Sequence, residues 1–277
     1  MQDQDLRLAV LIDADNVPRR CIKPVMEEIA VYGNPTLKRI YGDWTTPNLA
    51  KWKDDLLENA LTPIQQYSYT YGKNATDSAM IIDAMDILYS GNVDGFCIVS
   101  SDSDFTRLAI RLREAGKKVI GLGERKTPSP FIVACDRFIY IEVLGKQAAP
   151  QPAPAVKPPK KTAKAAPPAV PTPAADVPQR PAGNQQPQQE PAAKPKAPIP
   201  QDIIEYISLT IEDVGDDEGW AYLGEVGSLL QKKRPDFDSR NYGYKKLSSM
   251  LESCGYFEVD FRGNASNGKL IYVRVKR

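Results

Sequence analysis

The sequence predicts a doubly wound α/β domain with a mostly parallel sheet, followed by a C-terminal winged helix-turn-helix domain. Three observations lead to this fold class. Short apolar runs alternate with helical patterns over residues 1–145. Residues 146–200 hold 16 of the 24 prolines. Residues 201–277 then carry three helical patterns and two alternating segments. We therefore expect two folded domains joined by a linker.

The strands of the first domain are predicted from continuous apolar runs, which are typical of parallel strands covered on both faces. The first run, at 8–12, ends at Asp13. The predicted strands cover residues 8–12, 37–42, 64–71, 96–99, 119–123 and 138–141.

Helical patterns separate these strands. A short helix contains Val25 and Ile29, and a longer one covers 77–89. Another helix is predicted over 54–61, with Leu56, Leu57 and Ala60 facing the core. Helices between strands complete the alternation expected of a parallel sheet.

An acidic turn at residues 100–105, Ser-Ser-Asp-Ser-Asp-Phe, follows the apolar run 96–99 and precedes a helical pattern that stops at Gly116. In an open α/β sheet such a turn lies at the carboxyl end of a strand, where ligands bind. Two carboxylates two residues apart favour a cation, and hard divalent cations take oxygen ligands. The turn therefore predicts a site for Mg²⁺ or Mn²⁺.

Four aspartates from three separate segments are expected at this edge of the sheet. Asp13 ends the first strand, Asp77 lies in the first turn of the helix 77–89, and Asp102 and Asp104 lie in the acidic turn. Converging carboxylates are costly unless a cation is bound. We predict that all four bind the metal and take part in catalysis, with Asn16 supplying an amide nearby.

Each aspartate also has a structural explanation. Asp13 or Asp102 alone could cap a following helix, and Asp77 could be favoured by a helix dipole. A second enzymatic hypothesis starts from residues 13–16, Asp-Ala-Asp-Asn, which resemble the opening of haloacid-dehalogenase-type phosphatases, in which the first aspartate is a nucleophile. Asn16 stands where that motif has Thr or Val, so the phosphatase is the weaker alternative.

Composition excludes several kinds of chemistry. The chain has no histidine, which excludes Ser-His-Asp and Cys-His catalysis and His-ligated zinc sites. Its four cysteines are far apart in sequence and form no CxxC pair. The first residues are polar and acidic, and no apolar run approaches the ~20 residues of a membrane span. We therefore expect no membrane association and a cytoplasmic location.

The segment 146–200 is predicted to be an extended, disordered linker, because it is rich in proline, alanine and glutamine. It carries eight Lys or Arg and two acidic residues, so it could hold RNA loosely or act as a soluble spacer.

Residues 7–143 resemble an NYN domain of the LabA-like kind, within the PIN-like nuclease superfamily. The resemblance is carried by Ile-Asp-Ala-Asp-Asn at 12–16, Lys-Asn-Ala-Thr-Asp at 73–77 and the acidic turn at 99–105. It implies a metal-dependent ribonuclease, or a protein that keeps the fold with weak activity. Lys73 and Ser101 are accordingly expected to contact RNA.

The C-terminal domain resembles the LOTUS (OST-HTH) module through residues 219–227 and 241–247. That resemblance implies binding of RNA, with G-rich or structured RNA favoured in some modules, or of a helicase. The predicted RNA-binding cations cluster around the second and third helices: Lys232, Lys233, Arg234, Arg240, Lys245 and Lys246. An ordinary solvated helix face is the alternative explanation of this cluster.

Together these observations predict a cytoplasmic, Mg²⁺- or Mn²⁺-dependent ribonuclease with a tethered RNA-binding module. The competing hypothesis is an RNA-binding or regulatory protein whose nuclease fold is silent.

Overall fold

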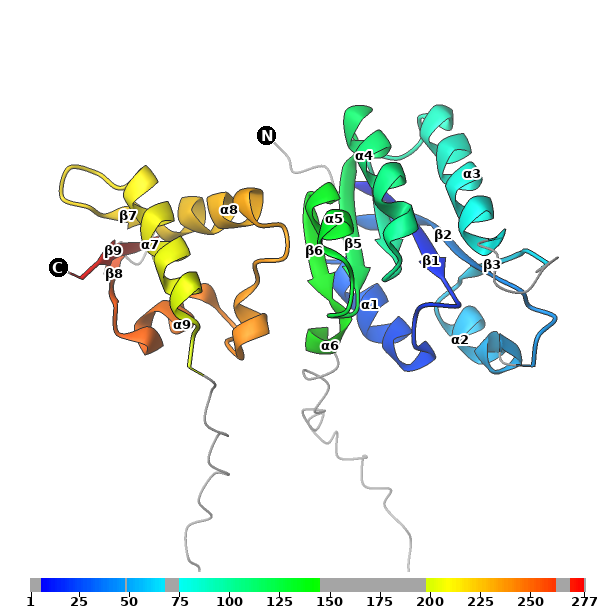
Figure 1. The fold of residues 1–277 in the computed structure, drawn as a ribbon, viewed down its shortest axis with the longest axis horizontal. Coiled ribbons are helices and arrows are strands. Elements are labelled where there is room, and N and C mark those ends of the chain that lie inside the picture. The colour runs from blue at the N-terminus through cyan, green and yellow to red at the C-terminus, as the bar shows by residue number, and fades with distance from the viewer. Residues whose placement is uncertain (1–5, 48, 68–74, 145–197, 263–269, 277) are drawn as a thin grey trace, which may run out of the picture. The chain divides into compact units, whose positions relative to one another are not determined.

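The computed structural model describes residues 6–47, 49–67, 75–144, 198–262 and 270–276. Up to residue 144 the chain forms a six-stranded sheet (Figure 1) in the order β3-β2-β1-β4-β5-β6, in which every pairing is parallel. Because the order reverses between β1 and β4, the sheet is doubly wound as predicted, and its topological switch point lies at the carboxyl ends of these two strands. The strands are β1 (Arg7–Asp13), β2 (Asn34–Gly42), β3 (Thr62–Gln65), β4 (Gly95–Val99), β5 (Lys118–Gly123) and β6 (Arg137–Tyr140).

Helices cover both faces of the sheet. On one face, α1 (Ile22–Ile29) and α6 (Ile141–Leu144) pack against alternate strand residues such as Val10 and Val99. On the other face, α3 (Ala75–Ser90), α4 (Thr106–Glu114) and α5 (Ser129–Ala134) pack against Leu11 and Ile98. Since successive strand residues point to opposite faces, each strand is buried on both sides, which explains its continuous apolar run.

The region around α2 (Lys53–Glu58) differs from the prediction. Leu57, expected to face the core, is 73% exposed, and Ala60 is exposed with a positive φ of 50°. A 3-10 helix, Leu49–Trp52, precedes α2 and supplies two buried side chains there, so that α2 contributes only the partly buried Leu56.

Two further differences concern the strand predicted at 64–71 and the last helices. Strand β3 ends at Gln65, and positions 68–71 lie outside the described residues. Helices α5 and α6 were not predicted. Each is at most six residues long, too short to show a helical period in the sequence.

From residue 201 the chain forms three helices, α7 (Gln201–Val214), α8 (Leu223–Lys233) and α9 (Leu247–Cys254), and a three-stranded antiparallel sheet. The sheet order is β7-β9-β8, with β7 at Ala221–Tyr222, β8 at Phe257–Arg262 and β9 at Leu270–Val275. Ile207, Val226, Met250 and Val273 share the core of this domain. The winged helix-turn-helix prediction agrees with this arrangement, except that the two-residue strand β7 was not predicted.

Among the residues that the structure describes, no helix is both long enough and apolar enough to cross a membrane.

Candidate functional site

The carboxyl ends of β1 and β4 bring the first predicted site residues together. The register pairs Ile12 with Val99, so the next residues along the two strands, Asp13 and Ser100, are neighbours. Both follow residues that face α3, Leu11 and Ile98, by two positions. Strand alternation therefore directs both side chains toward the amino end of α3, where Asp77 lies.

Asp13 is completely buried and accepts three hydrogen bonds. Asn16 Nδ2 and Ser100 Oγ donate to its Oδ2 at 2.7 and 2.8 Å, and the backbone N–H of Asp15 donates to its Oδ1 at 3.0 Å. Burial raises the pKa of Asp13, while the hydrogen bonds from Asn16, Ser100 and Asp15 act against that rise. Asp13 is thus the fixed centre of a buried polar network.

Three of the four predicted aspartates form one group. Asp77, Asp102 and Asp104 each offer a carboxylate oxygen, and these three atoms lie within 4.8 Å of one another. The fourth, Asp13, does not belong to this group, although its charge acts on Asp77. Asp77 comes from the first turn of α3, and Asp102 caps the 3-10 helix Ser103–Phe105 by accepting from Asp104 N at 2.9 Å.

The electrostatic environment of Asp77 is negative. Burial, followed by the charges of Asp13, Asp102, Asp104 and Asp15, raises the pKa of Asp77 to about 6. Its neighbours thus disfavour a further negative charge at this position. Three hard oxygen donors at this spacing suit a divalent cation such as Mg²⁺ or Mn²⁺, and bound cation charge would relieve the repulsion.

Ser100 is a site residue that no sequence motif indicated. Its Oγ donates to Asp13 and accepts from the backbone N–H of Asp102 at 3.1 Å, so it connects the buried aspartate to the acidic turn. The selected neighbour, Ser101, lies on the other side of the strand, where its Oγ accepts from Glu124 N at 2.8 Å. Strand alternation could have identified Ser100, because it continues the series Phe96 and Ile98 on the α3 face.

A second contact links the loop after β1 to α3. Thr76 Oγ1 donates to Asp15 Oδ2 at 3.1 Å. Asp15 therefore fixes the amino end of α3 next to Asp77. Lys73, predicted to contact RNA, lies outside the described residues.

The cations predicted to bind RNA in the C-terminal domain have different surroundings. Lys232, Lys245 and Lys246 are exposed. Lys233 pairs with Asp213, and Arg234 lies 3.8 Å from an Asp236 oxygen. Their contact with RNA stays a prediction.

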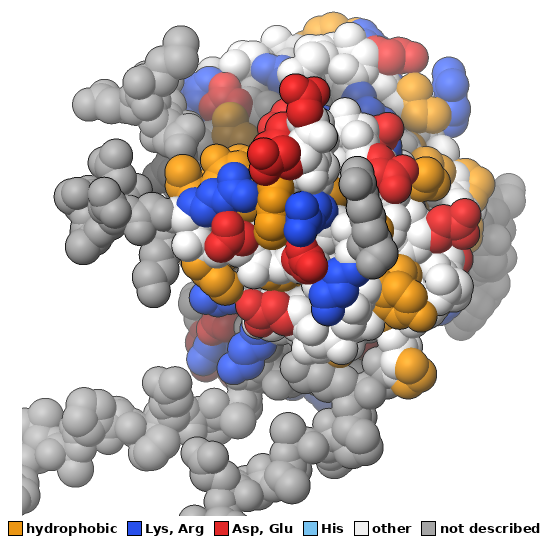
Figure 2. Space-filling model, turned by 90° about the vertical axis from the view of Figure 1, so that its left-hand side faces the viewer, with side chains coloured by type: hydrophobic (Ala, Val, Ile, Leu, Met, Phe, Trp, Pro, Cys, Tyr) orange, Lys and Arg blue, Asp and Glu red, His pale blue; other side chains and the backbone are white. Residues whose placement is uncertain are grey.

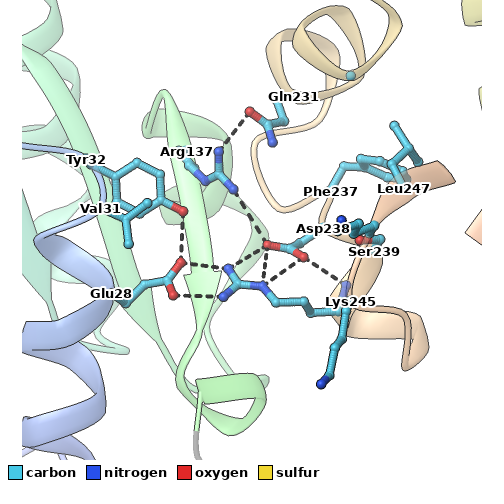
Figure 3. A pocket seen from close by; sticks show the side chains of 13 residues that line it. Glu28, Val31, Tyr32, Arg137, Gln231, Phe237, Asp238, Ser239, Lys245 and Leu247 are labelled. Carbon is cyan, nitrogen blue, oxygen red and sulfur yellow. Dashed lines mark hydrogen bonds and ion pairs between the residues drawn. The ribbon is translucent and has the colours of Figure 1, made fainter. Parts of the chain in front are cut away.

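Arg240 has the most extensive set of partners among these cations. Arg240 lines a pocket together with Glu28 and Asp238, and Figure 3 labels these two carboxylates. Its guanidinium donates to both carboxylate oxygens of Glu28, at 2.8 and 2.7 Å, and to Asp238 at 2.8 Å (Figure 3). These hydrogen bonds raise the pKa of Arg240. A phosphate that bound Arg240 would have to displace these two carboxylates.

A doubly wound parallel sheet flanked by helices, with carboxylates at its switch point, fits a PIN-like α/β fold. Comparison with protein families specifies the two domains: residues 7–142 match the NYN domain, and residues 196–268 match the OST-HTH/LOTUS domain. The chain thus combines an NYN domain with an OST-HTH/LOTUS domain, as the sequence motifs predicted. This pair of domains supports a nuclease and RNA-binding role.

Individual relatives cover parts of the chain. An uncharacterized protein of Methanocaldococcus jannaschii is 27% identical over 121 residues, which are 42% of this chain and 47% of the relative. Among solved structures, a protein of unknown function from Vibrio parahaemolyticus is 22% identical, with a TM-score of 0.44, over 51% of this chain and 96% of that one. An uncharacterized protein of Nitrosomonas europaea is 36% identical, with a TM-score of 0.25, over 36% of this chain and 93% of its own.

Proposed function

We propose that this protein is a ribonuclease that requires Mg²⁺ or Mn²⁺ and captures RNA through its C-terminal domain. The observation that carries the proposal is the group formed by Asp77, Asp102 and Asp104 at the switch point of an NYN-type sheet. When bound there, the metal would polarise the scissile phosphate and lower the pKa of an attacking water.

The protein's own groups hold and orient this site. The three carboxylates would hold the cation, and Asp13 keeps Asn16 and Ser100 in place through its hydrogen bonds. Ser100 in turn fixes the backbone of Asp102. The amide of Asn16 carries a second N–H, which could donate to a phosphate oxygen or a water. Hydrolysis by water is expected to leave a 5′-phosphate and a 3′-hydroxyl.

The buried position of Asp13 argues against the phosphatase alternative. A nucleophile must reach the substrate, whereas Asp13 has no exposed surface and accepts three hydrogen bonds. The silent RNA-binding alternative keeps the same fold and requires only that the acidic group fails to support cleavage.

The C-terminal domain supports RNA capture, since it matches the OST-HTH/LOTUS domain and exposes Lys232, Lys245 and Lys246. The predicted linker lies outside the described residues up to position 197, and it joins the two domains covalently. A covalent link raises the effective concentration of one domain near the other. RNA held by one domain would then be presented to the other.

The test is cleavage of end-labelled RNA by the full chain with Mn²⁺, with Mg²⁺ and with a chelator. We expect cleavage with either ion, none with chelator, and none for Asp102→Asn with Mn²⁺. Asp86→Asn, an exposed aspartate of α3 outside the acidic group, is the matched control and should cleave normally. Cleavage by Asp102→Asn at the wild-type rate would refute the assigned site, and absence of cleavage by the wild type with both ions would favour the silent alternative.

A further inference from the structure

The outer face of the C-terminal sheet carries aromatic and cationic side chains. The register pairs Tyr222 with Tyr272 and Glu258 with Arg274. Between these positions Val273 is buried in the domain core. Strand alternation therefore places Tyr272 and Arg274 on the face opposite the core. Figure 2 shows the side of the molecule where β8 and β9 lie in Figure 1, with basic, acidic and hydrophobic side chains interleaved on it.

The rings and guanidinium groups on this face contact one another. The Cζ atoms of Arg262 and Arg274 lie 4.8 and 4.6 Å from the ring centroid of Trp220. Arg262 Cζ also lies 4.6 Å from the Tyr272 ring centroid, and the Tyr272 and Tyr222 rings are 5.9 Å apart. Three aromatic rings and two flat cations thus form one continuous group, which we call the stacking face.

The Tyr222 ring lies beside Gly224 and the Tyr272 ring. Tyr222 is the N-cap residue of α8, and its side chain is 43% exposed. A Cβ atom at Gly224 would lie 2.7 Å from Tyr222 Cε1, so glycine at this position leaves the space that the ring occupies. An aromatic ring that already packs against neighbours loses less conformational entropy when a ligand stacks on it than a free side chain would.

The charges of the stacking face are balanced. Arg262 pairs with Asp260 at 2.8 Å, and Arg274 pairs with Glu258. Two arginines and two carboxylates leave no surplus positive charge to attract a phosphate backbone. The face instead offers π surfaces and guanidinium planes, which bind uncharged aromatic ligands by stacking.

We propose that the stacking face binds unpaired bases of single-stranded RNA. Single-stranded RNA can turn its bases onto aromatic and arginine surfaces, whereas a duplex keeps its bases stacked inside and presents phosphates and grooves. The proposal rests on the proposed RNA-binding function of this domain and assigns bases to the sheet, leaving the phosphates to the exposed lysines. It concerns residues that neither α8 nor α9 contributes.

The experiment measures binding of a fluorescein-labelled 12-nucleotide single strand and of a 12-base-pair RNA duplex to the full chain, by anisotropy in chelator. We expect Tyr222→Ala and Tyr272→Ala each to weaken single-strand binding about tenfold, because one stacked base is lost. Tyr222→Phe and Tyr272→Phe should bind as the wild type does, since the ring remains. Phe261→Ala is the matched control, because Phe261 is 52% exposed but lies on the other face of β8.

All variants should bind the duplex as tightly as the wild type does, because a duplex offers no unpaired bases. A single strand that contains 2-aminopurine tests stacking on the wild type, so this measurement does not depend on the folding of any variant. The fluorescence of the 2-aminopurine should be quenched when the strand binds. If the alanine variants bind single strands as tightly as the wild type, the stacking face is refuted while RNA binding by the domain stands, and a protein partner for the face is favoured. If the wild type binds neither RNA, the proposed RNA-binding function fails and the stacking face fails with it.

Discussion

The acidic group of the first domain and the six predicted cations of the second differ in how the fold controls them. Aspartate side chains are short, and the backbone at the strand ends or helix start fixes where their oxygens lie. Asp77, Asp102 and Asp104 accordingly converge within 4.8 Å. Lysine and arginine are long, and Arg240 turns to Glu28 and Asp238. Topology therefore predicts a site made of short side chains better than one made of long side chains.

The largest expected effect is that of a substitution in the acidic group, which should lower activity and raise stability. Asp77→Asn removes one of three carboxylates, and cleavage should fall by at least about 100-fold, since even outer-shell changes at metal sites cost 10–100-fold. Without metal, the same change should raise the free energy of unfolding by roughly 1 kcal/mol, because it removes like-charge repulsion. Cleavage assays and thermal unfolding in chelator measure the two effects.

Asp86→Asn on the same helix should change neither quantity. A loss of stability in Asp77→Asn would mean that the carboxylates do not repel one another strongly. The electrostatic argument for a bound cation would then fail.

The second effect concerns the long side chains. Lys245→Glu with Lys246→Glu should raise the KM for long RNA roughly tenfold and leave kcat nearly unchanged, because phosphate contacts in capture are lost but the acidic group is intact. Deletion of 201–277 should act in the same direction. Oligonucleotides too short to contact both domains should be cleaved equally by all forms. If the variant and the wild type had equal KM values on long RNA, these lysines would not bind RNA, and a protein partner such as a helicase would be the favoured ligand of this surface.

The third effect compares two adjacent serines. Ser100→Ala and Ser101→Ala each remove one hydroxyl that accepts from a backbone N–H, so each should destabilise the fold by about 1 kcal/mol. Only Ser100 also donates to Asp13, so only Ser100→Ala should lower kcat, by about tenfold. Steady-state kinetics at saturating Mn²⁺ distinguish the two. Equal kcat values would leave Ser100 with a purely structural role.

The smallest effect is a pH dependence. The folded-state pKa of Asp77 is raised from 3.8 to about 6. The protonated carboxyl therefore stabilises the metal-free fold below pH 3.8, and this stabilisation is lost as the pH rises through 6. Divalent ions bind the ionised form, so the rise in Tm on adding Mn²⁺ should shrink as the pH falls through 6.

Asp77→Asn should abolish this step near pH 6 in calorimetric scans with and without Mn²⁺. A Mn²⁺-dependent rise in Tm that stays constant from pH 7 to pH 5 would contradict the assignment.

The parts of the fold that were predicted from sequence are those with local causes. Continuous apolar runs identified β1 and β4, and their ends located Asp13 and Asp102. The exposure of Leu57 was not predictable from its own helix, because the neighbouring 3-10 helix fills the core there. Strand β7 has two residues and exists only through its pairing with β9, which no local pattern reveals.

The candidate site shows the same division. The convergence of Asp77 with the acidic turn followed from parallel-sheet topology. The place of Asp13 in a buried network was not predictable, because it depends on three hydrogen bonds from separate positions, including the one from Ser100. Such networks depend on the side-chain direction at each position, which a motif does not contain.

The hydrogen bond from Ser100 to Asp13 also has a consequence for biosynthesis. Its partners are 87 positions apart, and β1 pairs with β4 on one side and with β2, which follows it closely in sequence, on the other. A nascent chain must therefore release residues through about 105 from the ribosome before the acidic edge can close, and closing so long a loop is slow. A partly synthesised chain, which would be surrounded by messenger and ribosomal RNA, would be unable to assemble the proposed metal site until the acidic turn at 100–105 had emerged.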